Sequence, residues 1–191
     1  MASLQPVAVA VLAAGQSRRF GADDKLAAQF RGTMLGLHAC RTLSLLPFAQ
    51  RWVIASDARH PCGKGWREAG FTVVPNPHAG TGMGSSVALA AKLAQDAGVT
   101  ALLIALADMP LVPASHFADL LEHARPDALV TSHNGTSPTP PALFGSAHFP
   151  QLKEATGDTG ARALVSGAEA LTCESEWLVD IDDPSALARY S

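Results

Sequence analysis

Short apolar runs alternate with amphipathic stretches along this chain, as in the strand–helix–strand units that build mostly parallel sheets. The run Val7–Ala13 is apolar throughout and predicts a buried first strand. Further strands are predicted at Trp52–Ala55, Phe71–Val74, Ala101–Ala107, Ala128–Thr131 and Trp177–Ile181. Helices are predicted at Leu35–Leu46, Gly84–Ala97, Ala114–Ala124 and Thr159–Ser166, and a last helix from Pro184 with Asp183 as its cap.

This order of elements predicts one α/β domain over residues 1–191, with a Rossmann-like, mostly parallel sheet flanked by helices. The stretch His133–Pro141 carries three prolines and an Asn-Gly pair, which argue against a regular element. It is long for a connection within a compact domain, so we expect a functional loop there.

Composition narrows the class of protein. With 48% hydrophobic residues and a net charge of −3, the chain lacks the basic character of a nucleic-acid binder. The three scattered cysteines suit reduced thiols, and we expect a cytoplasmic protein. The N-terminal apolar run is too short to span a bilayer, and no positive charge precedes it as in a signal peptide, so no membrane association is expected.

A loop that could hold phosphate follows the first predicted strand. Gly15 and Gly21 enclose Arg18 and Arg19, and Lys25 lies four residues further on. Glycine lets the backbone approach an anion closely, and the cations supply countercharge. A P-loop would require Gly-Lys-Ser/Thr, which is not present after Gly21. The loop therefore predicts polyphosphate binding of another kind, and a merely solvated basic loop is the alternative.

Carboxylates follow two of the predicted strands. Asp108 comes directly after an apolar strand, where it could bind Mg²⁺ together with substrate phosphates. It is too early to cap the helix that begins after Pro113, for which Ser115 is a closer candidate. Asp180 and Asp182 share one face of the last predicted strand, so either could complete a metal site with Asp108.

Two further segments carry glycine with polar residues. In residues 76–86 the spacing is Gly-x-Gly-x-Gly, which is not the dinucleotide fingerprint. Ser85 or Ser86 could contact a base or ribose there, or could cap the following helix. In residues 157–162 the residues alone favour Asp158 as a helix cap and Arg162 as a surface residue. The seven histidines show no metal-ligand spacing, and we expect structural roles for them.

Taken together and in order, these motifs resemble those of the nucleotidyltransferases related to molybdenum cofactor synthesis. The matching segments are Leu12–Gly15, Arg19–Gly21, Lys25–Leu26, Gly82–Ser86, Ala107–Pro110, Gly157–Arg162 and Asp180–Pro184. The resemblance implies the fold of nucleotide-diphospho-sugar transferases. It also implies transfer of a nucleotidyl group from a nucleoside triphosphate to a molybdopterin-type small substrate, with release of pyrophosphate and with Mg²⁺ or Mn²⁺ as cofactor.

The resemblance also assigns roles by position. Arg19, Lys25 and Asp108 would be catalytic, with Asp108 and Asp182 or Asp180 holding the metal ion. Asp158 and Arg162 would face the acceptor substrate. The nucleotide would lie against Leu12, Ala13, Ala14, Gly15, Arg19, Lys25, Pro75, Gly84 and Ser85.

The nucleotide is expected to be CTP. Guanylyl-transferring relatives usually carry glycine where this chain has Ala14, although one methyl group is worth only about 1–3 kcal/mol in discrimination. The alternatives are a guanylyltransferase, another small phosphate acceptor, or a non-catalytic carrier that delivers the molybdenum cofactor to a recipient molybdoenzyme. A triphosphate site formed by Lys25 and Asp108 argues against a carrier. All of this requires these two side chains to lie together.

Overall fold

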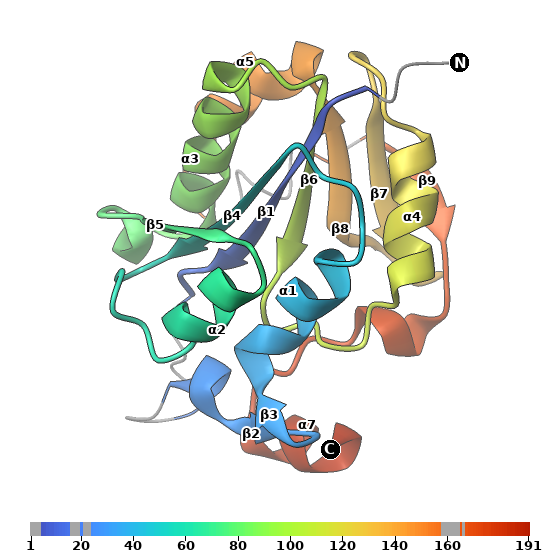
Figure 1. Ribbon diagram of the computed structural model, residues 1–191. Coiled ribbons are helices and arrows are strands. Elements are labelled where there is room, and N and C mark those ends of the chain that lie inside the picture. Colours follow the sequence, from blue (N-terminus) through green and yellow to red (C-terminus); the bar gives the residue numbers. More distant parts are fainter. Residues whose placement is uncertain (1–4, 16–19, 21–23, 158–164, 166) are drawn as a thin grey trace.

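The computed structural model describes residues 5–15, 20, 24–157, 165 and 167–191. Figure 1 shows a twisted sheet with helices on both faces. The order of the sheet is β5-β4-β1-β6-β8-β7-β9. Its strands are β1 (Val7–Ala13), β4 (Gln50–Ala55), β5 (Thr72–Pro75), β6 (Ala101–Leu106), β7 (Leu129–His133), β8 (Pro138–Gly145) and β9 (Glu169–Thr172). Neighbours pair in parallel except for β8, which runs antiparallel to both β6 and β7.

The helices of the described residues are short apart from α3 and α4. They are α1 (His38–Leu43), α2 (Gly63–Glu68), α3 (Met83–Asp96), α4 (Ala114–Glu122), α5 (Phe149–Lys153) and α7 (Pro184–Tyr190). Single 3₁₀ turns form η2 (Lys25–Ala27), η3 (Leu35–Leu37), η4 (Ala79–Thr81), η5 (Ser146–His148) and η6 (Ser175–Leu178). None of these helices is long and apolar enough to cross a membrane.

Strand β1 lies in the middle of the sheet and feeds two apolar cores. Successive side chains of a strand point to opposite faces, so Val9 and Val11 pack with α1, α2 and α4, whereas Ala8 and Ala10 pack with α3 and α5. All seven residues of β1 are buried. Burial on both faces explains why the run Val7–Ala13 is apolar rather than alternating.

A small hairpin packs beside the C-terminal helix, outside the main sheet. It consists of β2 (Gln29–Phe30) and β3 (Thr33–Met34), which pair antiparallel. Arg31 at its turn donates from Nε to the carbonyl of Tyr190 in α7 at 2.8 Å, and Figure 1 shows the two elements side by side. Helix α7 begins as predicted, because Asp183 accepts a hydrogen bond from the backbone of Ala186.

The predicted α/β fold and mostly parallel sheet are confirmed, and the strands predicted between residues 7 and 131 correspond to β1, β4, β5, β6 and β7. The predicted helix Leu35–Leu46 is shorter and is divided into η3 and α1. The predicted helix Thr159–Ser166 falls almost wholly outside the described residues.

Two predictions of local structure are wrong. The stretch Trp177–Ile181 is not a strand, because Trp177 and Leu178 end the turn η6, and Ile181 packs singly into the core. The stretch His133–Pro141 is not a free loop, because Pro138 and Thr139 pair with β7. Pro140 and Pro141 fall between the paired residues Thr139 and Ala142, where the ladder is interrupted and no backbone donor is required.

Candidate active site

A cleft of about 620 Å³ opens at the carboxyl ends of β1 and β6, in the size range of small-molecule sites. Ligands of open α/β sheets gather at this edge. The described residues that line it come from six segments of the chain. They are Leu12, Ala13, Ala14, Gly15, Lys25, Leu26, Ala79, Gly80, Thr81, Gly82, Met83, Ser86, Leu106, Asp108, Gly157, Asp180 and Asp182.

The Lys25 ammonium lies between two carboxylates of the cleft. Its Nζ donates to Asp108 Oδ2 and to Asp182 Oδ1, each at 2.6 Å, although the three residues are far apart in sequence. The expectation that Lys25 and Asp108 meet is therefore confirmed. Burial by itself disfavours the ammonium, but the two carboxylates outweigh burial and raise the pKa of Lys25 above its ordinary value. Lys25 is therefore fully charged at neutral pH.

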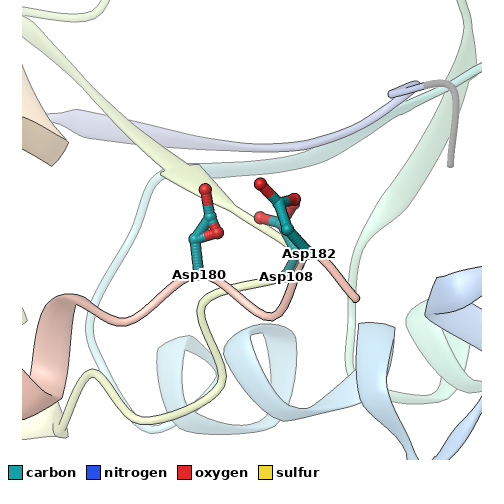
Figure 2. A group of neighbouring side chains, drawn as sticks. All are labelled: Asp108, Asp180 and Asp182. Atoms are coloured by element: carbon teal, nitrogen blue, oxygen red, sulfur yellow. The ribbon is translucent and has the colours of Figure 1, made fainter. Parts of the chain in front are cut away.

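Three carboxylates gather at this point, as Figure 2 shows. One oxygen each of Asp108, Asp180 and Asp182 lies within 4.8 Å of the others. Asp108 follows β6, and the other two flank Ile181, whose N–H donates to the carbonyl of Asp108 at 3.0 Å. That backbone bond brings the two segments together. Asp180 and Asp182 both belong to the cluster although the strand predicted for them does not form.

The donor set suits a hard divalent cation. Mg²⁺ and Mn²⁺ prefer carboxylate oxygens, and Mg²⁺ usually takes one or two carboxylates with water or phosphate oxygens as its other ligands. The three side chains point to the same side in Figure 2, toward the end of β6. Asp108 is about one fifth exposed and Asp182 about two fifths, so an ion and a ligand can reach them from the cleft.

The end of β1 forms one wall of the cleft. Leu12, Ala13, Ala14 and Gly15 all line it, as expected for residues that lie along a nucleotide. The predicted catalytic Arg19, with Arg18 beside it, lies outside the described residues. The same holds for Asp158 and Arg162, and the roles expected for these residues stay predictions.

The segment after β5 forms the facing wall, and its details differ from expectation. Of the residues predicted there, Pro75 ends β5, Gly84 packs against another segment, and Ser85 donates to backbone carbonyls at positions 78 and 82. None of the three is among the described residues that line the cleft. Helix α3 begins after Gly82 without a side-chain cap, so the alternative role of Ser85 or Ser86 as a cap is wrong. Helix α4 likewise begins without one, so Ser115 is no cap.

Sequence reasoning missed Asn76, which organises this wall. Its side chain is buried, and its Nδ2 donates to Ser85 Oγ and Ser86 Oγ at 3.0 Å each, while its Oδ1 accepts from the backbone of His78. Ser86 lines the cleft, as does Met83, a methionine that is 41% exposed. A polar residue directly after a strand was the available signal for Asn76.

Gly84 has a packing role that its sequence motif alone does not reveal. A Cβ at this position would lie 2.7 Å from the carbonyl oxygen of Gly157 and as close to the backbone of Thr156. Glycine thus lets α3 approach the segment that enters residues 158–162. Gly157 itself lines the cleft, so this contact sets the width of one end of the site.

Comparison with known proteins agrees with this geometry. The model of the MobA-like NTP transferase domain matches residues 9–173. The purine catabolism protein PucB of Bacillus subtilis (strain 168) is 32% identical over 191 residues, covering 91% of this chain and 90% of PucB. The family match extends over the β1 loop, the β5–α3 segment and Asp108.

Solved structures share the fold over nearly the whole chain. A nucleotidyl transferase from Methanothermobacter thermautotroptrophicus superposes with a TM-score of 0.81 at 18% identity, covering 96% of this chain and 95% of that one. Rv0371c from Mycobacterium tuberculosis H37Rv gives 0.77 at 21% identity, covering 98% of both chains, and its manganese complex gives 0.69 at 18%, covering 97% of both.

A third solved structure is the molybdopterin-guanine dinucleotide biosynthesis protein A of Archaeoglobus fulgidus. Its TM-score is 0.68 at 20% identity, and the match covers 96% of each chain. The family model spans most of the sequence, the PucB match exceeds 30% identity, and the site lies where the fold predicts it. The chain belongs to the MobA-like NTP transferase domain family and is a nucleotidyltransferase.

Proposed function

We propose that this nucleotidyltransferase transfers CMP from CTP to a phosphate of a molybdopterin-type acceptor and releases pyrophosphate. The observation that carries the proposal is the meeting of the Lys25 ammonium with Asp108 and Asp182 at the floor of the cleft. A cation and a carboxylate cluster in one crevice are what a triphosphate with its metal ion requires. A carrier of a finished cofactor would need neither.

The reaction needs no protein nucleophile. An oxygen of the acceptor phosphate forms a bond to the α-phosphorus of CTP. The bond from that phosphorus to the bridging oxygen of the β-phosphate breaks, and pyrophosphate leaves with the electron pair. Lys25 would neutralise charge that develops on the phosphates, and the cleft would hold the two substrates in line.

A divalent cation would be held by Asp108 with Asp182 and Asp180. When bound there, it would neutralise phosphate charge and orient the triphosphate. The manganese complex of Rv0371c supports a divalent metal in this fold. The carboxylates also fix Lys25, so the same side chains position both kinds of positive charge.

The choice of CTP rests on Ala14, which lines the cleft and is almost fully buried at the end of β1. Its methyl group narrows the space along the nucleotide, which favours the smaller pyrimidine ring. The acceptor would lie at the end of the cleft at Gly157, which in sequence precedes Asp158 and Arg162, the residues expected to face it. The likeness to a molybdopterin-guanine dinucleotide protein supports a molybdopterin-type acceptor.

The test is pyrophosphate release by the purified protein with Mg²⁺, molybdopterin and each of CTP, GTP, ATP and UTP in turn. We expect release with CTP far above that with the other three nucleotides. Release with GTP alone would overturn the choice of base. Binding of molybdopterin without release from any nucleotide would favour the carrier instead. Thermal shifts with each nucleotide give an independent readout, because a ligand of the folded state raises the melting temperature.

A further inference from the structure

The turn that carries Lys25 is held by a carboxylate that makes two separate contacts. Asp24 is the N-cap of η2, and its Oδ1 accepts the backbone N–H of Leu26 at 2.9 Å. Its Oδ2 lies 2.6 Å from Nε2 of His60. Lys25 stands between these anchored residues, so the path of its backbone is fixed from the residue before it and the residue after it.

His60 is oriented so that it must donate to Asp24. Its Nδ1 accepts the backbone N–H of Cys62 at 3.1 Å, so this nitrogen carries no proton. The proton of the neutral ring is therefore on Nε2, which faces Asp24 Oδ2. The ring is only 6% exposed and stacks against Trp66 with the centroids 4.6 Å apart. Both its rotation and its tautomer are thus set by neighbours.

The segment that follows β4 holds η2 at a second point. Cys62 Sγ donates to the carbonyl of Leu26 at 3.2 Å, and Leu26 is buried beneath the turn. Gly36 packs closely against the same contact, because a Cβ at position 36 would lie 3.0 Å from the side chain of Leu26 and 3.2 Å from that of Cys62. Residues 60–62 therefore hold the Lys25 turn at two points, its N-cap Asp24 and the carbonyl of Leu26.

We infer that Asp24 and His60 are positioning residues that hold the Lys25 ammonium on Asp108 and Asp182. The consequence for catalysis rests on the proposed function, in which Lys25 binds the triphosphate. Neither Asp24 nor His60 is among the described residues that line the cleft. They act through Lys25, whose side chain extends from the turn that they hold to both carboxylates.

The charges of the pair are consistent with this role. The hydrogen bond from His60 lowers the pKa of Asp24, and burial opposes that shift only in part. Asp24 is therefore ionised across the working pH range and accepts both hydrogen bonds at once. An asparagine has a single acceptor oxygen and could satisfy only one of the two donors.

Three variants separate positioning from folding. His60→Phe keeps a ring against Trp66 and removes the donor to Asp24 together with the acceptor of the Cys62 N–H. His60→Gln restores a donor. Asp24→Asn leaves one acceptor for two donors, and the side chain at position 24 is about one third exposed, so water can reach it. The control is Arg59→Ala in the same segment. This side chain is 91% exposed, and its ion pair with Asp57 at 3.7 Å is a surface contact whose loss should change little.

The first readout needs no substrate. With ¹³Cε-labelled lysine, the chain gives four lysine signals, and the chemical shift of the Lys25 signal at a fixed neutral pH reports the contacts of its ammonium with Asp108 and Asp182. In His60→Phe and Asp24→Asn, we expect this signal to move away from its position in the unaltered protein. Arg59→Ala and His60→Gln should leave it in place. An unchanged Lys25 signal in both folded variants would overturn the inference, whether or not the proposed reaction occurs.

The second readout is the rate of pyrophosphate release. We expect about a tenfold loss in His60→Phe, because small displacements of a catalytic group are costly, and recovery of most of the rate in His60→Gln. The loss should fall in the same parameter, kcat or KM, that Lys25→Ala changes. In the Lys25→Ala background, His60→Phe should have no further effect. An undiminished tenfold loss in that background would show that His60 acts independently of Lys25 and would refute the assignment.

Discussion

Replacement of Lys25 by methionine tests the electrostatics of the site directly. The Lys25 side chain is 10% exposed, and its ammonium lies 2.6 Å from oxygens of Asp108 and Asp182. Asp180 completes a group of carboxylates whose oxygens lie within 4.8 Å of one another. Two like charges 4.8 Å apart repel by about 1 kcal/mol at a dielectric constant of about 80 and by about 3.5 kcal/mol at about 20. The site is partly open, so a value between these limits applies.

We expect Lys25→Met to lower the free energy of unfolding by about 2 kcal/mol in the presence of a chelator. For a chain of this length, that corresponds to a fall of about 4–8 °C in melting temperature. Mg²⁺ or Mn²⁺ should recover much of the loss, because the carboxylates lose their ammonium and bind the ion more strongly. The metal should therefore raise the melting temperature of the variant more than that of the unaltered protein.

The assay is thermal unfolding followed by circular dichroism, in EDTA and over a titration of each metal. Lys92→Met is the matched control. Its ammonium lies 2.7 Å from Asp96, but both side chains are at least 60% exposed, so its loss should cost less than about 1 kcal/mol and create no metal response. The carboxylates do not form the cation site described here if Lys25→Met has the same melting temperature in EDTA as the unaltered protein. The same conclusion follows if metal raises the melting temperature of the variant no more than that of the unaltered protein.

Three further outcomes follow from the structure. Asp108→Ala should abolish nucleotidyl transfer while the melting temperature stays within a few degrees of the unaltered protein, because the residue lies beyond the strand end; full turnover by the folded variant would refute its role. Gly84→Ala should force the backbone of Gly157 away by about 0.7 Å, from 2.7 Å to ordinary contact at 3.4 Å, and cost about 1–3 kcal/mol in denaturant unfolding. Burial lowers the pKa of His116 below 6.5. As the pH falls, the unfolded chain therefore takes up a proton at His116 before the folded protein does. The contribution of His116 to stability should be constant above about pH 6.5 and decrease below it, so denaturant titrations from pH 8 to pH 5 should show a flatter profile for His116→Gln.

The central strands could be predicted from the sequence because they are buried on both faces. A strand such as β1 must be apolar at every position, and that signal does not depend on the rest of the fold. Edge and irregular elements carry no such signal. Strand β9 is short and mostly exposed, and β8 contains prolines that only its interrupted pairing with β7 can accommodate. The run Trp177–Ile181 resembles a strand in sequence because Leu178 and Ile181 are each buried in the core, although no sheet forms there.

The candidate site was predictable to the extent that it follows from strand ends. Lys25, Asp108, Asp180 and Asp182 all follow or flank apolar runs and meet in the cleft. Asn76 and His60 could not be found in the same way. Their side chains contact other segments, Asn76 through Ser85 and Ser86 and His60 through Asp24. Such contacts depend on loop geometry, which has no periodicity in sequence.

The meeting of Lys25 and Asp108 is a consequence of sheet topology rather than of local sequence. Strands β1 and β6 are parallel neighbours in which Leu12 pairs with Leu106, so the segments that follow the two strands leave the sheet at the same edge. Lys25 and Asp182 are 157 residues apart, and only the assembled fold brings them together. A cation that binds this cluster must therefore bind the folded protein far more tightly than the unfolded chain. Metal-dependent stabilisation should accordingly disappear in Asp108→Asn, even though that variant keeps both other carboxylates.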